Sequence, residues 1–200
     1  MRYFLTEIAQ IVGGRLVGCD LEVASVATDS RSYALDHNTL FVAMRGVNHD
    51  AHDHIAEVAE RGIKAFMVER EVTLTEGCGA VVVENSLTAL QALAEYHRTT
   101  FNGKVIGITG SNGKTTVKEW IAQCAPSHAK IFRSPRSYNS QLGVALSLHR
   151  CKTLLMSIAY RGKDDHVGLY HLLESLHLAL LRNSGLDNSR LIAVIHHQER

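Results

Sequence analysis

An apolar stretch that breaks into glycines and then delivers Gly-Lys-Thr constrains this chain more than any other feature. Residues 105–116 read Val-Ile-Gly-Ile-Thr-Gly-Ser-Asn-Gly-Lys-Thr-Thr. This order predicts a buried strand that ends near Thr109, a loop whose backbone N–H groups surround a polyphosphate, and a helix that begins where the loop ends. In such a loop Lys114 reaches the β- and γ-phosphates, and Thr115 ligates Mg²⁺. The sequence therefore predicts a nucleotide-binding α/β domain.

The loop differs from the general Walker A pattern at one position. Ile108 lies five residues before Gly113, where that pattern has glycine. Gly110 is the other glycine inside the loop, so two permissive backbone positions remain beside the lysine and the hydroxyl. The alternative is an ordinary Gly/Asn turn before a helix, which the order of strand, loop and Lys-Thr disfavours. The residues expected to bind the nucleotide are Thr109, Gly110, Ser111, Asn112, Gly113, Lys114, Thr115 and Thr116.

Composition excludes several classes of partner. Lys and Arg number 21 against 20 Asp and Glu, so no basic face is indicated and nucleic acid is not an expected partner. The cysteines, Cys19, Cys78, Cys124 and Cys151, are far apart and read as reduced thiols. Glu7 interrupts the start of the chain too early for a signal peptide, and no apolar run is long enough to cross a bilayer. A cytoplasmic location without membrane contact is expected.

Helical and strand patterns alternate along the chain, which favours α/β architecture. Thr6 is expected to cap the first helix and Gly13-Gly14 to end it, while Ser86 is expected to cap a later one. A polar joint at residues 98–103 separates a small amino-terminal domain, 1–100, from the beginning of a parallel-sheet phosphate-loop domain, 104–150. The expected elements are a helix over 6–12, a strand over 40–44, a helix over 51–61, a strand over 63–68, a strand over 81–83 and a helix from Ser86.

Four segments, in the order that the family has them, resemble the Mur ligase family, which builds the peptidoglycan precursor in the bacterial cytoplasm. Residues 28–31 (Thr-Asp-Ser-Arg) and 40–53 are similar to two signatures of the domain that holds the UDP-sugar end of the substrate. Residues 107–120 are similar to the family's ATP loop and helix, and residues 137–144 to its Asn-rich segment. Val117-Lys118-Glu119 and the run at 133–140 are most similar to members that add D-alanyl-D-alanine, above all to those joined to an alanine racemase.

The resemblance implies a set of substrate-binding residues. The hydroxyl, backbone N–H groups and guanidinium of Asp-Ser-Arg can bind a diphosphate. Taken alone, Asp-Ser-Arg would be interpreted as a solvated turn, and so would the Asn-Ser pair at 139–140. Two positions depart from the family pattern: Ala51 stands where glycine precedes the histidine, and Ala145 stands where proline follows Gly-Val. The residues implied are Asp29, Ser30, Arg31, Gly46, Asn48, His52, Asn139 and Ser140.

The reaction implied is ATP-driven amide synthesis with Mg²⁺. The γ-phosphoryl group passes to the terminal carboxylate of UDP-N-acetylmuramoyl-tripeptide, and the amine of D-alanyl-D-alanine attacks the resulting acyl phosphate. Lys114 stabilises charge on the transferring group and Thr115 positions the metal.

The resemblance is expected to end near residue 149. The family's next strand, its acidic Mg²⁺ ligand, its catalytic lysine and histidine and its third domain have no expected counterpart in the tail at 151–200. Asp164-Asp165-His166 follows polar residues, so a solvated turn is favoured there over a metal site. Truncation, a shifted reading frame or an insertion would each produce such a tail.

Two alternatives to a Mur-type ligase remain open. One is a different phosphate-loop enzyme, such as a kinase or a ligase of the folylpolyglutamate synthase type, which the two UDP-domain signatures disfavour. The other is a non-catalytic nucleotide-binding fragment, which the missing metal and catalytic residues favour for this chain taken alone.

Overall fold

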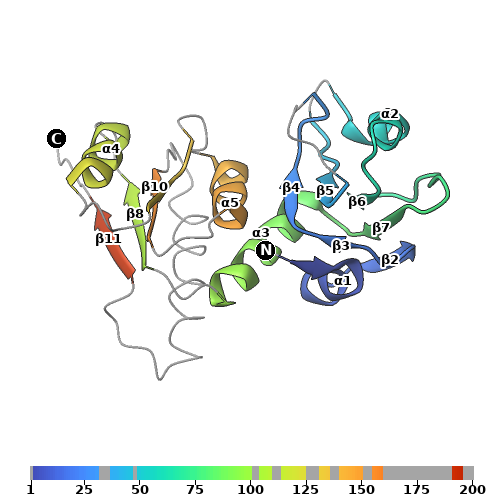
Figure 1. Ribbon diagram of the computed structural model, residues 1–200, viewed down its shortest axis with the longest axis horizontal. Coiled ribbons are helices and arrows are strands. Elements are labelled where there is room, and N and C mark those ends of the chain that lie inside the picture. The colour runs from blue at the N-terminus through green and yellow to red at the C-terminus, as the bar shows by residue number, and fades with distance from the viewer. Residues whose placement is uncertain are drawn as a thin grey trace. The chain divides into compact units, whose positions relative to one another are not determined.

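The computed structural model describes residues 2–31, 37–46, 49–100, 104–109, 114–124, 131–135, 140–150, 155–159 and 191–195. The chain divides into two compact units, residues 1–96 and 97–200. The division falls within helix α3 (Ser86–Thr100). Each unit is built around its own sheet (Figure 1).

Unit 1 contains a five-stranded sheet in the order β2-β7-β6-β5-β4. Strands β4 to β7 are parallel neighbours, and β2 pairs antiparallel with β7 at one edge. A separate antiparallel pair joins β1 to β3. The strands are β1 (Tyr3–Phe4), β2 (Arg15–Gly18), β3 (Glu22–Val23), β4 (Ser25–Ala27), β5 (Thr39–Val42), β6 (Ala65–Val68) and β7 (Gly79–Val82).

The helices of unit 1 lie where apolar periodicity predicted them, but two caps differ. Phe4 caps α1, because the Glu7 carboxylate accepts a hydrogen bond from its backbone N–H, and Thr6 lies inside the helix. Asn85 caps α3 by accepting from the backbone N–H of Thr88, so Ser86 is the first helical residue. The helical segments are α1 (Leu5–Val12), the 3₁₀ turn η1 (Ala51–His54), α2 (Ile55–Glu60) and α3.

The core of unit 1 forms between the sheet and α2. Phe41 and Phe66 are fully buried on neighbouring strands and meet edge to face, with ring centroids 6.4 Å apart. Val58 of α2 and Ile63, which follows it, are buried against them. Because β5 and β6 are buried throughout and are apolar except for Thr39, they match the continuous pattern expected of central parallel strands.

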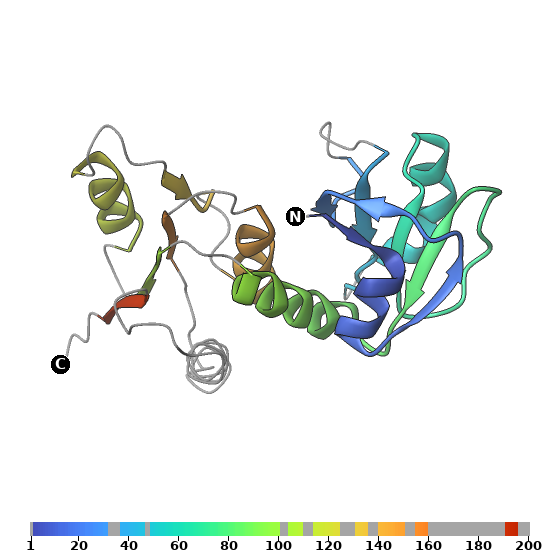
Figure 2. The same cartoon turned by 60° about the horizontal axis from the view of Figure 1, so that its bottom comes forward.

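Unit 2 contains a parallel sheet in the order β11-β8-β10-β9. From β8 the chain passes through α4 to β9 on one side, whereas β11 lies on the other side of β8 (Figures 1 and 2). The predicted α/β class is thus confirmed. The elements are β8 (Lys104–Thr109), α4 (Lys114–Cys124), β9 (Ile131–Arg133), α5 (Gln141–Arg150), β10 (Leu155–Ala159) and β11 (Leu191–Ile195).

The strands of the tail correct one expectation. A strand does follow α5: β10 lies between β8 and β9 in register with both, and β11 completes the other side of β8. The mostly apolar run Leu155-Met156-Ser157-Ile158-Ala159 is long enough for a strand, and the sheet provides two neighbours for it. Residues 164–166 lie outside the described residues. Within the described part of the chain, no helix is long and apolar enough to cross a membrane.

Candidate functional site

The carboxyl ends of β4, β5 and β6 form one edge of the unit 1 sheet. Ala27 pairs with Phe41, and Val42 pairs with Met67, so the segments after these strands leave the sheet side by side. Asp29 to Arg31 follow β4, Arg45 and Gly46 follow β5, and Arg70 follows β6. Ligands of open α/β sheets bind at this kind of edge. The sheet thus brings together the two signatures that are separated in sequence.

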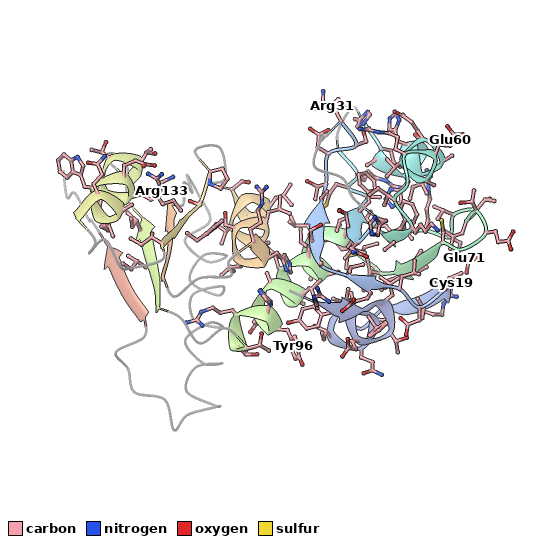
Figure 3. All side chains as sticks on the ribbon, in the orientation of Figure 1. Cys19, Arg31, Glu60, Glu71, Tyr96 and Arg133 are labelled. Atoms are coloured by element: carbon pink, nitrogen blue, oxygen red, sulfur yellow. The ribbon has the colours of Figure 1, made fainter. Side chains whose placement is uncertain are left out.

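Arg31 and Asp29 form a bidentate ion pair in the first of these loops. The Arg31 Nε–Asp29 Oδ1 distance is 3.0 Å and the second guanidinium contact is 3.2 Å. These hydrogen bonds hold the pKa of Asp29 below its usual value. The Arg31 side chain is 88% exposed. Figure 3 labels its position in unit 1. An exposed ion pair of this kind is weak. Arg31 can therefore exchange its partner for an anionic ligand at little cost.

Arg61 supports the same loop from the end of α2. Its guanidinium donates to the backbone carbonyl of Ser30, across 31 positions of sequence. Sequence reasoning missed Arg61, because an arginine at a helix end reads as a solvated residue. The contact adds a second guanidinium beside Ser30.

Gly46 makes the turn after β5 tight. Its backbone N–H donates to the His49 carbonyl at 2.7 Å, and a Cβ at Gly46 would lie 3.2 Å from that oxygen. Ala51 starts η1, and no non-glycine residue of the described chain has a positive φ. Alanine therefore fits this position without backbone strain. Asn48 lies outside the described residues.

His52 has partners that differ from those implied by the resemblance. Its side chain is fully buried; Nδ1 lies 2.5 Å from Asp50 Oδ1, and Nε2 accepts a hydrogen bond from the Glu69 backbone N–H at 2.8 Å. Because Nε2 is an acceptor, Nδ1 carries the proton and donates to Asp50. Both ring nitrogens are thus occupied within the protein. We assign the ring to supporting the loop rather than to contacting a ligand directly.

Asp50 is the centre of this support. It accepts from both the backbone N–H and the ring of His52, and these bonds lower its pKa to about 2. The Arg45 and Arg70 guanidinium groups each lie 3.6 Å from its other oxygen. Arg70 also contacts Asp53 at 2.8 Å. The Asp-x-His spacing could have predicted the local Asx turn between Asp50 and His52. The contact with Arg70 could not be predicted in this way, because Arg70 follows β6 and is distant from Asp50 in sequence.

Removing the Asp50 carboxylate should destabilise unit 1. Asp50→Ala leaves the buried Nδ1–H of His52 without its acceptor, so we expect a loss of about 1–3 kcal/mol in the free energy of unfolding at pH 7. Asp50→Asn keeps an acceptor oxygen and should lose less. Because the folded-state pKa is depressed, the contribution of Asp50 is present above pH 4 and is lost as pH falls toward 2. Urea titrations of both variants at pH 7 and pH 3 measure these differences. Equal losses at pH 7 would contradict the assignment.

The phosphate-loop region follows the carboxyl end of β8 in the sheet of unit 2. β8 ends at Thr109 and α4 begins at Lys114, as the sequence predicted. Thr115 and Thr116 are exposed on the first turn of α4. The exposed Thr115 hydroxyl fits an Mg²⁺ ligand supplied together with phosphate oxygens. Residues 110–113 and the Lys114 side chain lie outside the described residues. Among those described, no three His, Cys, Asp or Glu side chains form a metal site.

Ser140 has a structural role at the start of α5. Its hydroxyl accepts from the Gly143 backbone N–H at 3.2 Å, and its carbonyl accepts from that of Val144 at 2.9 Å. These contacts are those of a helix cap. Ala145 is buried within α5. Asn139, the neighbouring candidate, lies outside the described residues.

Comparisons with known proteins identify similar sequences and similar folds. Residues 108–160 match the family described as Mur ligase middle domain, so family sequence continues past the expected end at 149. UDP-N-acetylmuramoyl-tripeptide–D-alanyl-D-alanine ligase of Bacillus subtilis is 32% identical over 145 residues, which cover 70% of this chain and 31% of that protein. The crystal structure of MurF from Acinetobacter baumannii has a TM-score of 0.72 at 26% identity, covering 80% of this chain and 36% of that one. MurF from Thermotoga maritima in complex with ADP has a TM-score of 0.63 at 28% identity, covering 75% of this chain and 35% of that one.

These matches, together with the fold, show that the chain is similar to the Mur ligases. The relatives and solved structures that it resembles are named UDP-N-acetylmuramoyl-tripeptide–D-alanyl-D-alanine ligase or MurF. The chain spans about a third of the length of these relatives.

Proposed function

We propose that the chain forms the UDP-substrate and ATP-binding parts of a ligase that adds D-alanyl-D-alanine to UDP-N-acetylmuramoyl-tripeptide. The observation that carries the proposal is the position of Lys114 and Thr115 at the start of α4, the helix that follows β8, where the strand order reverses. Nucleotides bind parallel sheets at this point. In the reaction, the tripeptide carboxylate attacks the γ-phosphorus of ATP and ADP leaves. The amine of D-alanyl-D-alanine then attacks the acyl carbon and phosphate leaves.

The nucleotide site uses the segment from Thr109 to Thr116. Backbone N–H groups at the start of α4 favour a bound polyphosphate, Lys114 neutralises charge on the transferring group, and Thr115 holds Mg²⁺. The ADP complex of the similar protein from Thermotoga maritima supports nucleotide binding. When bound, Mg²⁺ would neutralise charge on the phosphates.

The UDP-sugar site uses the carboxyl edge of the unit 1 sheet. Arg31 and Arg61 flank Ser30, and Gly46 allows backbone to approach a ligand closely. Guanidinium groups bind phosphate oxygens in a bidentate geometry, so a diphosphate suits this edge. Asp29 would release Arg31 as the diphosphate arrives, while Asp50 and His52 keep the neighbouring loop in place.

Binding of the UDP substrate tests this part of the proposal. We expect UDP-N-acetylmuramoyl-tripeptide to shift NMR signals of residues 29–31 and 45–46, and ADP to leave them unchanged. Arg31→Ala should raise the dissociation constant, because a charge-assisted hydrogen bond is lost. Arg15→Ala is the matched control, since Arg15 is also exposed and paired with a carboxylate, Glu71. Equal effects of both variants on the dissociation constant would contradict the assignment.

We assign a separate role to each of three successive segments of the chain. Residues 1–100 hold the UDP substrate, residues 104–150 begin the ATP-binding domain, and residues 151–200 include β10 and β11 of the same sheet. A cytoplasmic location is part of the proposal. Cys19 and Cys78 are free thiols, which agrees with a reducing compartment.

A non-catalytic role is the second candidate. It applies to the chain taken alone, which spans about a third of the relatives' length. On this view the chain binds UDP substrate and nucleotide but completes no reaction. A different phosphate-loop ligase, such as the folylpolyglutamate synthase type, is disfavoured by the signatures at residues 28–31 and 40–53, which belong to a UDP-binding domain.

A further inference from the structure

Helix α3 begins at the same edge of the unit 1 sheet as the proposed UDP-sugar site. Val68 pairs with Val82, and the backbone N–H of Val83 donates to the Val68 carbonyl at 2.9 Å, so the segments after β6 and β7 leave the sheet side by side. β5 and β6 are parallel neighbours, which puts their carboxyl ends at this edge as well. The residues that follow β6 therefore lie between the loop after β5 and the first turn of α3.

Glu69, the first residue after β6, is bonded to both of these neighbours. Its backbone N–H donates to His52 Nε2 at 2.8 Å, and its Oε1 atom accepts from the backbone N–H of Ser86 at 2.8 Å. Ser86 is the first residue of α3 and is fully buried. Its N–H is one of the donors that a helix leaves without an acceptor of its own at its amino terminus. Glu69 thus joins the ring of His52 to the start of α3.

The hydrogen bonds continue on the other side of the His52 ring. Nδ1 of His52 donates to Asp50, whose other carboxylate oxygen lies 3.6 Å from the guanidinium groups of Arg45 and Arg70. Because the His52 side chain and Ser86 are fully buried, breaking one of these bonds leaves a buried polar group without its partner. We call the four hydrogen-bonded residues, Asp50, His52, Glu69 and Ser86, the edge–α3 relay.

We propose that Glu69 couples the UDP-substrate edge to α3, so that a UDP-linked ligand bound at the edge stabilises the first turn of the helix. The inference rests on the proposed UDP-sugar function. A ligand that binds the arginines at this edge favours the arrangement in which Asp50 holds them and His52 holds the Glu69 N–H. In that arrangement the Glu69 carboxylate lies on the Ser86 N–H. Glu69 is a positioning residue, because it acts through the relay and does not contact the ligand.

The coupling gives α3 a role beyond covering the sheet. The helix crosses the division between the two units, and the chain passes from its end to β8, the strand before the phosphate loop. Its first turn is therefore the point at which occupancy of the UDP-substrate edge reaches the connecting segment. Coupling between two sites is reciprocal, so a change that loosens this turn weakens ligand binding by the same factor.

Amide hydrogen exchange, measured by NMR on the full chain, tests the proposal. UDP-N-acetylmuramoyl-tripeptide should slow exchange at Ser86 and Ala89 about fivefold or more in the wild-type protein, and by less than about twofold in Glu69→Ala. Glu69→Gln should recover part of the slowing, because its amide oxygen also accepts from the Ser86 N–H. The matched control is Glu71→Ala, which removes a 76% exposed carboxylate two residues away (Figure 3). A purely structural role would lower the melting temperature of Glu69→Ala and leave the slowing intact, and equal slowing in both alanine variants would overturn the proposal.

Ligand affinity provides the reciprocal test. By calorimetry, the dissociation constant for UDP-N-acetylmuramoyl-tripeptide should rise about fivefold in Glu69→Ala and stay within about twofold of wild type in Glu71→Ala. If Glu69→Ala does not fold, Asn85→Ala loosens the same turn by removing the acceptor of the Thr88 N–H. That variant should raise the dissociation constant about threefold, and wild-type affinity would overturn the proposal.

A measurement without ligand separates the relay from the UDP function. The nitrogen NMR signals of the His52 ring should shift or broaden in Glu69→Ala relative to Glu71→Ala, because Nε2 accepts from the Glu69 N–H. Unchanged ring signals would overturn the relay. If the ring signals respond but the wild-type chain does not bind UDP-N-acetylmuramoyl-tripeptide, the proposed UDP function fails and the coupling to ligand fails with it.

Discussion

Lys114→Ala should weaken the binding of ATP with Mg²⁺ by about 2–3 kcal/mol, or roughly 30- to 150-fold in the dissociation constant. Lys114 is the first residue of α4. The Gly-Lys-Thr motif predicts that its side chain contacts the β- and γ-phosphates. Losing a charge-assisted contact to phosphate removes most of the charge neutralisation that the side chain provides. Isothermal titration calorimetry with ATP and Mg²⁺ measures the change directly.

Lys64→Ala is the control for Lys114→Ala, because Lys64 is exposed in unit 1 and far from the loop in sequence. AMP provides a second control. It lacks the β- and γ-phosphates, so its weaker binding should be the same in wild-type and Lys114→Ala proteins. Equal affinity of both proteins for ATP would exclude the phosphate-loop assignment.

The elements with strong local patterns could be predicted from the sequence. The apolar run before Gly110 predicted β8, and Gly-Lys-Thr predicted the start of α4. Helical spacing of Leu90 and Leu93 predicted α3, and both are fully buried. Each of these elements can be predicted from residues that are close together in the sequence. The two-residue strands β1 and β3 carry no periodic pattern, and the sequence could not indicate them.

The roles of individual side chains were harder to predict, because they depend on contacts distant in sequence. His52 reads as a ligand for the substrate, but its acceptor contact with the Glu69 N–H depends on the pairing of β5 with β6. Lys118 reads as a solvated helix residue, yet it is buried because β9 brings the Ser134 carbonyl to it. The β10 strand was missed for a different reason. Its apolar residues are plain in the sequence, but they follow the point where family resemblance was expected to end.

The 200-residue chain in isolation should show no ligase activity. Phosphoryl transfer requires the metal charges, the substrate carboxylate and the attacking amine to be held together, and correct positioning supplies roughly 7–11 kcal/mol of the reduction in barrier. The chain spans about a third of the relatives' length, and the proposed UDP-substrate and phosphate-loop segments lie in the part that it matches, which leaves a remainder of about two-thirds of such a protein. Family resemblance assigns the second acidic metal ligand and the domain that closes over ATP to that remainder.

Purified protein supplied with ATP, Mg²⁺, UDP-N-acetylmuramoyl-tripeptide and D-alanyl-D-alanine should therefore release phosphate no faster than a Lys114→Ala control. Binding of each nucleotide ligand is expected to persist under the same conditions, which separates an incomplete enzyme from an unfolded one. Mass spectrometry of the reaction mixture detects the pentapeptide product directly. If product forms in proportion to the enzyme added and disappears in the Lys114→Ala protein, residues 151–200 must supply catalytic groups beyond the strands β10 and β11. In that case the chain is a compact ligase, and the missing acid and base are to be sought at the carboxyl ends of those two strands, which share the sheet edge with the phosphate loop.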